Sequence, residues 1–516
     1  MGPLDIAIVV VYLGFVATLG LYFSSRQKTT EDYFLAGRNI PGWVVGFSML
    51  GAIVSSATFI GHPGNVFDKN MFLVPFHIVP LFVMLFVARY LVVFYRRTLK
   101  MTVYAYLEKR FGYPARAYGA ASFVVSRVAD VSVTYYFLAI ATAFLTDWDV
   151  GAVILVLGVI TVLYTLLGGI QAVVWTDVVQ GILLIGGGLL CVAIVLFQSE
   201  ADPTEIVVRA WEGGKFEIGR WEFSLSENNQ WFYIIGSVFI WVQAFACGQN
   251  NVQRYLLARS DKEAVRGAYL GAAACVPIWL LFMLVGALLW SFFQISAEQL
   301  PQEVLENKDR IVPYFVRTHF PAGLKGLMLA TLIAAAMSSL DSDLNAMAAV
   351  VVSDFYQRLR PQSSDRRCLF VGKSAVVLLG IASVLLALQW TRIEDESFVE
   401  FMVTMAMIVT GGILGLFALG ILFRWTTARG AYLGILACLA FLLWATVTTI
   451  KLPDTEVPVV DLGAYNYTLS PLLIGVLGHV VLVLVGLAAS VLLGGPKPDT
   501  AGLTLSDAIA SQSRSD

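Results

Sequence analysis

Charged residues are scarce in this sequence. Asp, Glu, Lys and Arg make up 14% of the 516 residues and hydrophobic residues make up 58%, whereas roughly a quarter of the residues in soluble proteins are charged. We therefore predict a protein embedded in a lipid bilayer. The formal net charge is only -2 and no basic stripe is present, which argues against nucleic acid as a partner.

Paired cysteines and catalytic motifs are also lacking. The five cysteines stand singly in apolar stretches, with neither metal-ligand spacing nor the pairing of secreted proteins, so we interpret them as packing residues. No HExxH, GxSxG or Asp-rich diphosphate motif occurs. These absences argue against a membrane enzyme, and we expect no organic cofactor.

Apolar stretches long enough to cross about 30 Å of hydrocarbon dominate what remains. The first has no basic segment before it and no small-residue cleavage site, so we expect it to be a retained span rather than a signal peptide. The thirteen candidates cover residues 4–23, 41–66, 71–95, 118–146, 150–168, 173–198, 231–251, 267–295, 323–356, 369–390, 398–423, 430–450 and 470–494.

Basic residues follow the first, third, seventh and ninth of these spans, and all four loops fall on one side. Short loops rich in Lys and Arg face the cytoplasm, so we predict an external N-terminus, a cytoplasmic C-terminus and external loops at 199–230 and 296–322. A cell membrane location, such as a bacterial inner membrane, fits this pattern. The basic residues include Arg26, Lys28, Arg38, Arg96, Arg97, Lys100, Lys109, Arg110, Arg116, Arg254, Arg259, Lys262, Arg266, Arg358, Arg360, Arg366 and Arg367.

Two spans are interrupted by small and polar residues, at 51–64 and at 243–251. Lipid tolerates irregular backbone only where the freed polar groups line a cavity or bind something. Two such breaks, each opening a set of five spans, are typical of secondary transporters built from inverted repeats. A channel is the second interpretation, because carbonyl sites also build ion filters.

The expected organisation is all-α and polytopic, with repeats at 41–198 and 231–423. An extra N-terminal helix and loop (1–40) precede them, an external loop (199–230) separates them, and two further spans (424–494) and a flexible tail (495–516) follow.

A stripe of small residues runs along the ninth span: Ala335, Ser338, Ser339 and Ser342 are spaced i, i+3, i+4 and i+7, on one helical face. Hydroxyl and carbonyl oxygens suit a hard cation such as Na+. Small residues also let membrane helices pack closely, so the stripe alone leaves both readings open.

Four motifs resemble the sodium:solute symporter family, which includes sodium/glucose cotransporters and bacterial sodium/sialic acid symporters. They are GAIVSSATFIG in the second span, YTLLGGIQAVVWTDVVQG before the sixth, NNVQRYLLARS after the seventh and AAAMSSLDSDLNA in the ninth. The likeness extends from about residue 33 to 429. It implies a LeuT-type five-plus-five core with about 13 transmembrane helices, Na+ as the coupling ion, and symport of a small polar organic solute.

The resemblance also implies a principal sodium site. It would consist of the carbonyls of Gly51 and Val54, beside the first break, with the Ala335 carbonyl and the Ser338 and Ser339 hydroxyls across it. A broken helix frees carbonyls for this purpose.

A second cation site, present in some family members, would combine Asp177 with Ser338, Asp341 and Ser342. Asp341 departs from the small hydroxyl residue expected there. Either two carboxylates hold one cation, or one of them carries a proton. Asp177 alone is equally compatible with a helix cap.

The substrate stays open between a sugar or sugar derivative, our first expectation, and a monocarboxylate, a sugar acid or an amino acid. The sialic acid symporters place an Arg where this sequence has Asp130, with Arg127 one turn away. Those two residues form either a structural ion pair or part of the substrate site. The sugar cotransporters' hexose-binding Gln aligns near Val403. Further substrate candidates are Ser55, Ser56, Thr58 and Phe245. The oligomeric state is not predicted.

Overall fold

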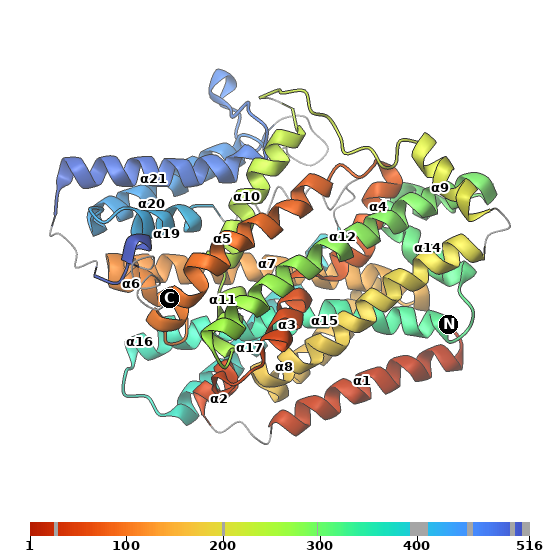
Figure 1. Cartoon of the computed structure of the whole chain (residues 1–516), viewed down its shortest axis with the longest axis horizontal. Coiled ribbons are helices and arrows are strands. Elements are labelled where there is room, and N and C mark those ends of the chain that lie inside the picture. Colours follow the sequence, from red (N-terminus) through yellow and green to blue (C-terminus); the bar gives the residue numbers. More distant parts are fainter. Residues whose placement is uncertain are drawn as a thin grey trace.

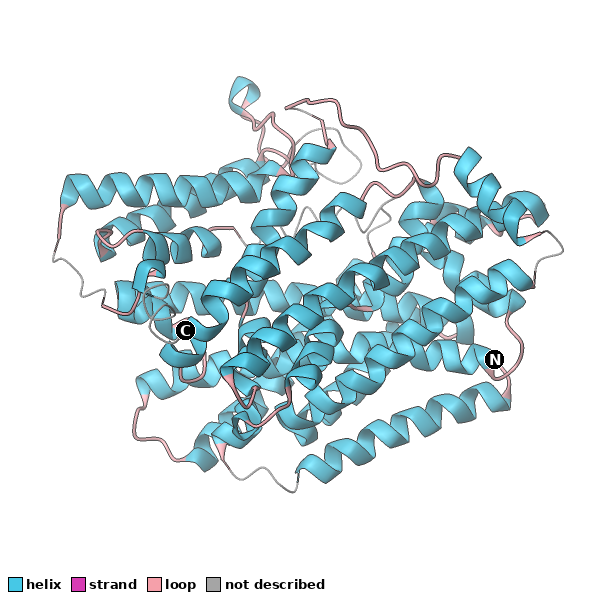
Figure 2. Ribbon diagram, in the orientation of Figure 1, coloured by secondary structure: helices cyan, strands magenta, loops and turns pink. Residues whose placement is uncertain are grey.

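The protein is helical throughout the part that the structure describes (Figure 2). The computed structural model describes residues 1–24, 29–198, 202–225, 227–296, 298–392, 411–450, 458–495 and 501–507. The helices are α1 (Pro3–Ser24), α2 (Thr30–Leu35), η1 (Ala36–Arg38), α3 (Gly42–Ile53), α4 (Ser56–Asp68), α5 (Val74–Thr98), α6 (Ala105–Phe111), α7 (Tyr113–Thr146), α8 (Val150–Phe197), α9 (Pro203–Glu212), α10 (Gln230–Cys247), α11 (Gln249–Leu257), α12 (Asp261–Ser296), α13 (Gln302–Glu306), η2 (Lys308–Arg310), α14 (Ile311–His319), α15 (Leu324–Val350), η3 (Val351–Tyr356), α16 (Gln357–Leu359), α17 (Asp365–Trp390), α19 (Ile413–Leu422), α20 (Ala428–Val447), η4 (Gly463–Tyr465) and α21 (Leu473–Leu493).

Ten of the described helices are long and apolar enough to cross a membrane, and an eleventh span results if the bent pair α3 and α4 counts as one. Two shorter apolar helices, Val150–Leu166 and Ile413–Leu422, lie where two further spans are predicted. A multi-pass membrane protein is therefore confirmed, while thirteen spans stays a prediction. Part of the predicted span 398–423 lies outside the described residues.

Both predicted interruptions are breaks in the helical backbone. Between α3 and α4, Val54 and Ser55 are extended and the two helices meet at 54°. Between α10 and α11, Gly248 is extended. The α4 helix begins where the Ser55 hydroxyl accepts the amide of Ala57, at 3.3 Å, which satisfies one donor of the new helix end.

The α15 helix lies at the centre of the bundle and packs against α8, α7, α1, α3 and α11 (Figure 1). The buried share of its apolar window is 83%, against 22% for the peripheral α1. Because side chains on α15 meet several helices at once, this helix can carry a site built from distant parts of the sequence.

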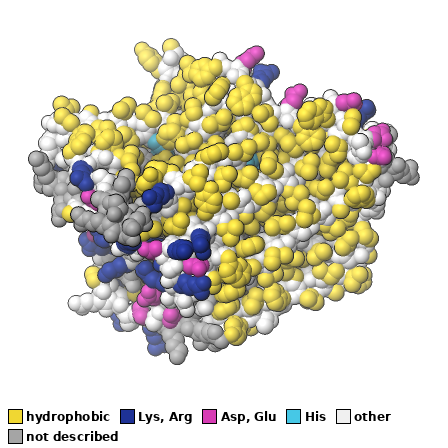
Figure 3. Space-filling model, viewed as in Figure 1, with side chains coloured by type: hydrophobic (Ala, Val, Ile, Leu, Met, Phe, Trp, Pro, Cys, Tyr) yellow, Lys and Arg dark blue, Asp and Glu magenta, His cyan; other side chains and the backbone are white. Residues whose placement is uncertain are grey.

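Basic side chains gather at one end of the molecule, at the lower left of Figure 3, where α2, α6 and α16 end. There Arg38, Lys100, Lys109 and Arg358, which come from three separate loops, line one surface cleft. The N-terminus lies at the opposite end (Figure 1). The loops that follow spans one, three and nine are therefore on the same side, as predicted.

Three arginines assigned to the predicted cytoplasmic loops after the third and seventh spans are instead buried. Arg110 donates to the carbonyls of Gly420, Phe423 and Thr426, Arg116 pairs with Asp354 at 2.5 Å, and Arg254 lies inside α11 with no exposed side chain. Counting basic residues along the sequence fails here because each guanidinium is bonded to groups far away along the chain.

Part of the predicted flexible tail is packed on the protein. Arg424 pairs with Asp507 at 2.6 Å, and the Tyr106 hydroxyl donates to the Leu503 carbonyl at 3.0 Å. Residues 501–507 thus cover the ends of α6 and α19. The five cysteines are all buried and free, as expected for packing residues.

Candidate functional site

Five oxygen atoms named by the sequence converge beside the first break. The Ser338 hydroxyl lies 2.8 Å from the Gly51 carbonyl and 3.0 Å from that of Ala335. The Ser339 hydroxyl lies 3.1 Å from the Gly51 carbonyl and 3.3 Å from that of Val54. Three carbonyls and two hydroxyls, with both serines buried, form the kind of oxygen set that hard cations prefer.

Close packing at Gly51 holds this oxygen cluster together. A Cβ at this position would lie 3.2 Å from Asp177 in α8. The missing side chain lets α3 approach α8, while the turn before the break directs the Gly51 and Val54 carbonyls toward α15. The serine stripe therefore does more than permit tight packing, because its hydroxyls bond to the broken helix.

Asp177 is neither exposed nor at a helix end. It lies eight residues beyond Gly169, the positive-φ residue that bends α8, and a capping effect fades within the first turn. The helix-cap reading is therefore wrong. Its carboxylate accepts the Ser48 hydroxyl at 2.5 Å and pairs with Arg254 at 3.3 Å, with both side chains fully buried.

The guanidinium of Arg254 lies between Asp177 and Ser342, where sequence reasoning predicts a second cation. It donates to the Ser342 hydroxyl at 2.5 Å, to Ser48 at 3.0 Å and to the Asn250 carbonyl at 2.7 Å. The Ser342 hydroxyl also donates to the Ser338 carbonyl at 2.5 Å. Asp341, the fourth member of that predicted site, is fully buried beside the Ser342 backbone amide, and no side chain among the described residues donates to its carboxylate.

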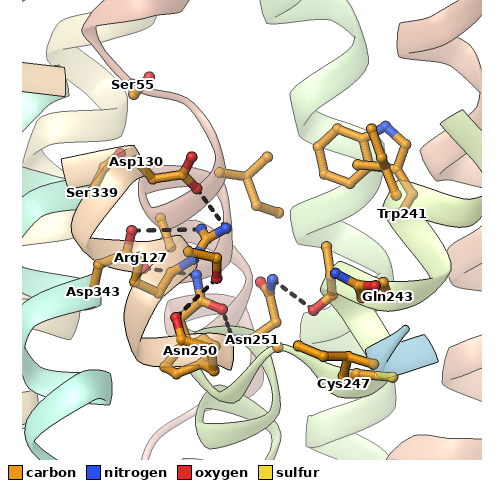
Figure 4. A pocket seen from close by; sticks show the side chains of 18 of the residues that line it. Ser55, Arg127, Asp130, Trp241, Gln243, Cys247, Asn250, Asn251, Ser339 and Asp343 are labelled. Carbon is orange, nitrogen blue, oxygen red and sulfur yellow. Dashed lines mark hydrogen bonds and ion pairs between the residues drawn. The ribbon is translucent and has the colours of Figure 1, made fainter. Parts of the chain in front are cut away.

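A cavity of about 240 Å³ opens next to the oxygen cluster, and Ser55 and Ser339 line it. We call it the central pocket (Figure 4). On one wall Arg127 pairs with Asp130 at 2.5 Å and lies 3.7 Å from Asp343. The structure thus contains the ion pair foreseen from the sequence, and it adds Asp343.

The second break supplies further residues of the central pocket. Asn250 donates to Asp343 at 2.8 Å, next to Arg127, and Asn251 donates to the Ala244 carbonyl at 3.1 Å. Trp241 and Gln243 form the wall opposite Arg127 (Figure 4). The Gln243 Oε1 and Asn251 Oδ1 atoms are buried without a hydrogen-bond partner among the described residues, so both can accept from a ligand.

Sequence reasoning missed Asp343, Asn250 and Asn251. Asp343 falls four residues after Ser339, on the same helical face, and the two asparagines follow the break at Gly248, after Gln249. Polar residues next to a backbone break were the signal that could have identified them.

Three predicted substrate residues do not line the central pocket. Ser56 is buried and donates to the Thr134 carbonyl at 3.0 Å, and Thr58 is buried further along α4. Phe245 packs on Trp241 with ring centroids 5.3 Å apart, so Trp241, one turn earlier, is the aromatic residue at the pocket wall. Because Ser55 ends the extended segment, only its side chain faces the cavity. The Val403 position lies outside the described residues.

Comparison with known proteins gives one consistent result. A model of the sodium:solute symporter family matches residues 33–438, well over half of the chain. The chain belongs to this family.

Two curated relatives of the symporter illustrate its range. It is 30% identical over 488 residues to the sodium/sialic acid symporter NanT of Aliivibrio fischeri, covering 94% of this chain and 92% of that one. It is 28% identical over 481 residues to the sodium/glucose cotransporter of Vibrio parahaemolyticus, covering 87% and 86%. The family and these relatives are transporters, which excludes the enzyme reading.

A solved structure shares the whole fold of the symporter. It is described as the substrate-bound outward-open state of a Na+-coupled sialic acid symporter with a novel Na+ site, and it aligns with a TM-score of 0.85 at 29% identity. The alignment covers 96% of this chain and 99% of that one. Sodium-coupled symport is therefore the function class, and Na+ is the coupling ion.

The second break in the symporter differs from the first. The Tyr255, Tyr95 and Tyr104 hydroxyls donate to the carbonyls of Phe245, Ala246 and Cys247 at 3.1, 2.7 and 2.9 Å. The backbone acceptors freed at Gly248 are thus satisfied by buried phenols.

Proposed function

We propose that this symporter couples sodium entry to the uptake of a small neutral or amine-bearing sugar derivative by alternating access. The principal sodium site is the cluster formed by Gly51, Val54, Ala335, Ser338 and Ser339. The observation that carries this proposal is the convergence of five oxygen atoms on the first break, adjacent to the central pocket.

The charges that line the central pocket are the reason for proposing a neutral or amine-bearing substrate. Arg127 is engaged by Asp130, and Asp343 adds a second carboxylate. No Lys or Arg occurs in the sequence 393–410, so that segment supplies no further positive charge. Carboxylates and free amide oxygens accept hydrogen bonds, which suits hydroxyl or amine donors and disfavours a substrate carboxylate.

A sugar acid is the second candidate. The names of the sialic acid relatives and the presence of Arg127 in the pocket favour it. Binding a carboxylate would require Arg127 to release Asp130, which would leave two carboxylates facing the ligand. The monocarboxylate and amino acid alternatives meet the same obstacle at their carboxyl groups.

One sodium ion gives useful coupling. Moving one charge across 100 mV contributes about 2.3 kcal/mol, which supports roughly fortyfold accumulation at about 1.4 kcal/mol per decade. This is sufficient for nutrient uptake from a dilute medium.

We also propose the orientation and organisation expected from the sequence. The end that carries Arg38, Lys100, Lys109 and Arg358 faces the cytoplasm, which puts the N-terminus outside and the C-terminus inside a bacterial inner membrane. Residues 41–198 and 231–423 form the inverted repeats, each opening on a broken helix.

Thermal unfolding of the purified full-length protein tests the proposed function. Glucose, glucosamine, glucuronate, sialic acid and lactate are each added in NaCl and in choline chloride, because ligand binding to the folded state raises Tm. We expect glucose or glucosamine to raise Tm in NaCl only. Glucose and glucuronate have the same sugar ring and differ in the carboxylate of glucuronate, so comparing them isolates the effect of the carboxylate on binding. Stabilisation by the acids alone would establish the second candidate, and stabilisation without any sodium dependence would contradict the symport site.

A further inference from the structure

A surface cleft of about 900 Å³ lies at the end of the molecule where the basic side chains gather (Figure 3). Residues of η1, α5, α6, α7, η3 and α16 surround it, and its volume is in the range of sites that bind organic ligands. We call it the basic cleft. Two acidic side chains and six basic ones line it: Glu31, Glu108, Arg38, Arg97, Lys100, Lys109, Arg116 and Arg358.

Carboxylates pair with the four arginines of the basic cleft but not with its lysines. Glu108 lies 2.6 Å from both Arg116 and Arg358, so it holds these two guanidinium groups next to each other. The other two arginines pair with carboxylates at 3.3 and 3.5 Å. In the described part of the chain, neither Lys100 nor Lys109 pairs with a carboxylate. The cleft therefore carries positive charge in excess of its acidic side chains.

The convergence of these residues is more than a topological signal requires. Membrane orientation depends on the number of basic residues in short loops, and it does not require them to meet in space. Arg38 has a left-handed backbone with φ 55°, and its guanidinium donates to the Lys100 carbonyl at 2.6 Å. Such a backbone is strained for a residue other than glycine and persists where its surroundings hold it. This contact fixes the loop after α2 against the loop after α5.

An apolar surface adjoins the basic cleft. Leu359 directly follows Arg358 in α16, and its side chain is 73% exposed. Pro361 lines the cleft itself. A ligand that carries both a phosphate and an acyl chain would meet a suitable surface for each part. Basic pockets between membrane helices at the cytoplasmic side bind the headgroups of anionic lipids.

We propose that the basic cleft binds the phosphate group of an anionic phospholipid from the cytoplasmic leaflet. Lys100 and Lys109 supply the charge that the carboxylates leave over. The guanidinium of Arg358 adds donors in the planar arrangement that matches phosphate oxygens. This inference rests on the proposed function only in placing this end of the molecule in the cytoplasm.

The segment 101–104 connects the basic cleft with the central pocket. Met101 and Thr102 line the cleft, while Tyr104 lines the pocket. The side chain of Gln249, the residue after the second break, donates to the Met101 carbonyl at 2.9 Å. A phosphate bound in the cleft thus lies against a segment that is fixed to the second break, so the lipid composition influences how this end of the pocket opens.

Thermal unfolding of the delipidated full-length protein in detergent tests the lipid site. Dioleoylphosphatidylglycerol, dioleoylphosphatidylcholine and glycerol phosphate are each titrated in choline chloride, because a ligand that binds the folded state raises Tm. The two lipids have the same acyl chains and differ in net charge, whereas glycerol phosphate provides a phosphate without acyl chains. We expect only phosphatidylglycerol to raise Tm. The absence of sodium keeps this measurement independent of the symport site.

Two double variants locate the binding. Lys100→Gln with Lys109→Gln should weaken phosphatidylglycerol binding roughly thirtyfold, because each basic residue near the membrane surface contributes about 1 kcal/mol and about 1.4 kcal/mol corresponds to a factor of ten. Both lysines are exposed, so we expect this variant to fold. The matched control Lys262→Gln with Arg266→Gln removes two exposed charges from α12, outside the lining of the cleft, and should keep the wild-type affinity.

Three results would change or overturn the proposal. Equal stabilisation by phosphatidylglycerol and phosphatidylcholine, or an unchanged phosphatidylglycerol affinity in the lysine variant, would overturn it. An equal rise in Tm with glycerol phosphate, lost in the lysine variant, would retain the phosphate site but overturn the lipid as its source. Each of these results would leave the proposed sodium-coupled transport intact.

Discussion

Small and polar residues interrupt both broken helices, but the two breaks have different roles. At the α3–α4 break, the Gly51 and Val54 carbonyls accept hydrogen bonds from serine hydroxyls of α15. At the α10–α11 break, three successive carbonyls are each capped by a tyrosine hydroxyl from α5, α11 or the segment before α6. The first break therefore provides oxygen ligands for an ion. The carbonyls at the second break are hydrogen-bonded by tyrosines, and this break contributes side chains to the central pocket.

The chemistry of the partner explains this difference. A serine hydroxyl is small, can rotate and has lone pairs that can themselves ligate a cation. A tyrosine brings a large rigid ring that fills the space around the carbonyl it caps. The two breaks therefore differ in function because different side chains face their carbonyls.

The largest expected effect comes from the arginine that joins the two breaks. Arg254 in α11 contacts Ser48 in α3 and pairs with buried Asp177. Arg254→Met strands that carboxylate and should cost about 3–5 kcal/mol of stability, measured as a fall in Tm of the purified protein. The double variant Arg254→Met with Asp177→Leu should recover most of the loss. An unchanged Tm in the single variant would show that the pair does not hold the breaks together.

The glycines at the breaks should respond in different ways. A Cβ at Gly248 would lie 2.6 Å from the Ala244 carbonyl, whereas one at Gly51 would lie 3.2 Å from Asp177. We expect Gly248→Ala to cost about 1–3 kcal/mol through overpacking and Gly51→Ala to cost less. Only Gly51→Ala should raise the sodium concentration needed for half-maximal stabilisation, because it displaces a ligand carbonyl. A sodium titration monitored by thermal unfolding measures both quantities, and the opposite pattern would reverse the roles of the two breaks.

A single phenol at the second break should matter moderately. Tyr95→Phe removes the donor to the Ala246 carbonyl, and a buried acceptor left unpaired costs about 1–3 kcal/mol. The predicted fall in Tm is equal in NaCl and in choline chloride. A loss that occurs only in NaCl would place an ion at the second break.

The smallest stability effect is expected at the pocket ion pair. Arg127 and Asp130 are both partly exposed, and such pairs contribute about 0–1 kcal/mol. Asp130→Asn should leave Tm and the sodium response nearly unchanged while weakening binding of a neutral or amino sugar. Unchanged ligand binding in this variant would remove Asp130 from the substrate site.

Local pattern was enough to predict the breaks and to single out the serine stripe of α15. Polar residues inside an apolar span, and an alanine and three serines spaced i, i+3, i+4 and i+7, can be recognised from one stretch of sequence. Their placement against each other came from the family resemblance, because Ser338 and Gly51 are 287 residues apart.

Long-range charge pairing could not be predicted in the same way. Arg254 was counted with the cytoplasmic loops because it follows an apolar span, yet its partner lies 77 residues earlier in α8. Asp343 was overlooked for a related reason. Its neighbours Arg127 and Asn250 come from α7 and α11, and no local pattern brings these three residues together.

The most direct test of this account compares one hydroxyl from each break. Sodium-induced stabilisation is measured by thermal unfolding for the wild type, Ser339→Ala and Tyr104→Phe, in NaCl and in choline chloride. At a sodium concentration of about 100 times Kd, binding should stabilise the wild type by about 2.7 kcal/mol. The account predicts that Ser339→Ala loses the sodium-induced stabilisation, while its Tm in choline chloride is nearly unchanged. Tyr104→Phe should lower Tm in both salts but retain the sodium-induced stabilisation. Full sodium stabilisation in Ser339→Ala, or its loss in Tyr104→Phe, would contradict the assignment of the ion to the first break.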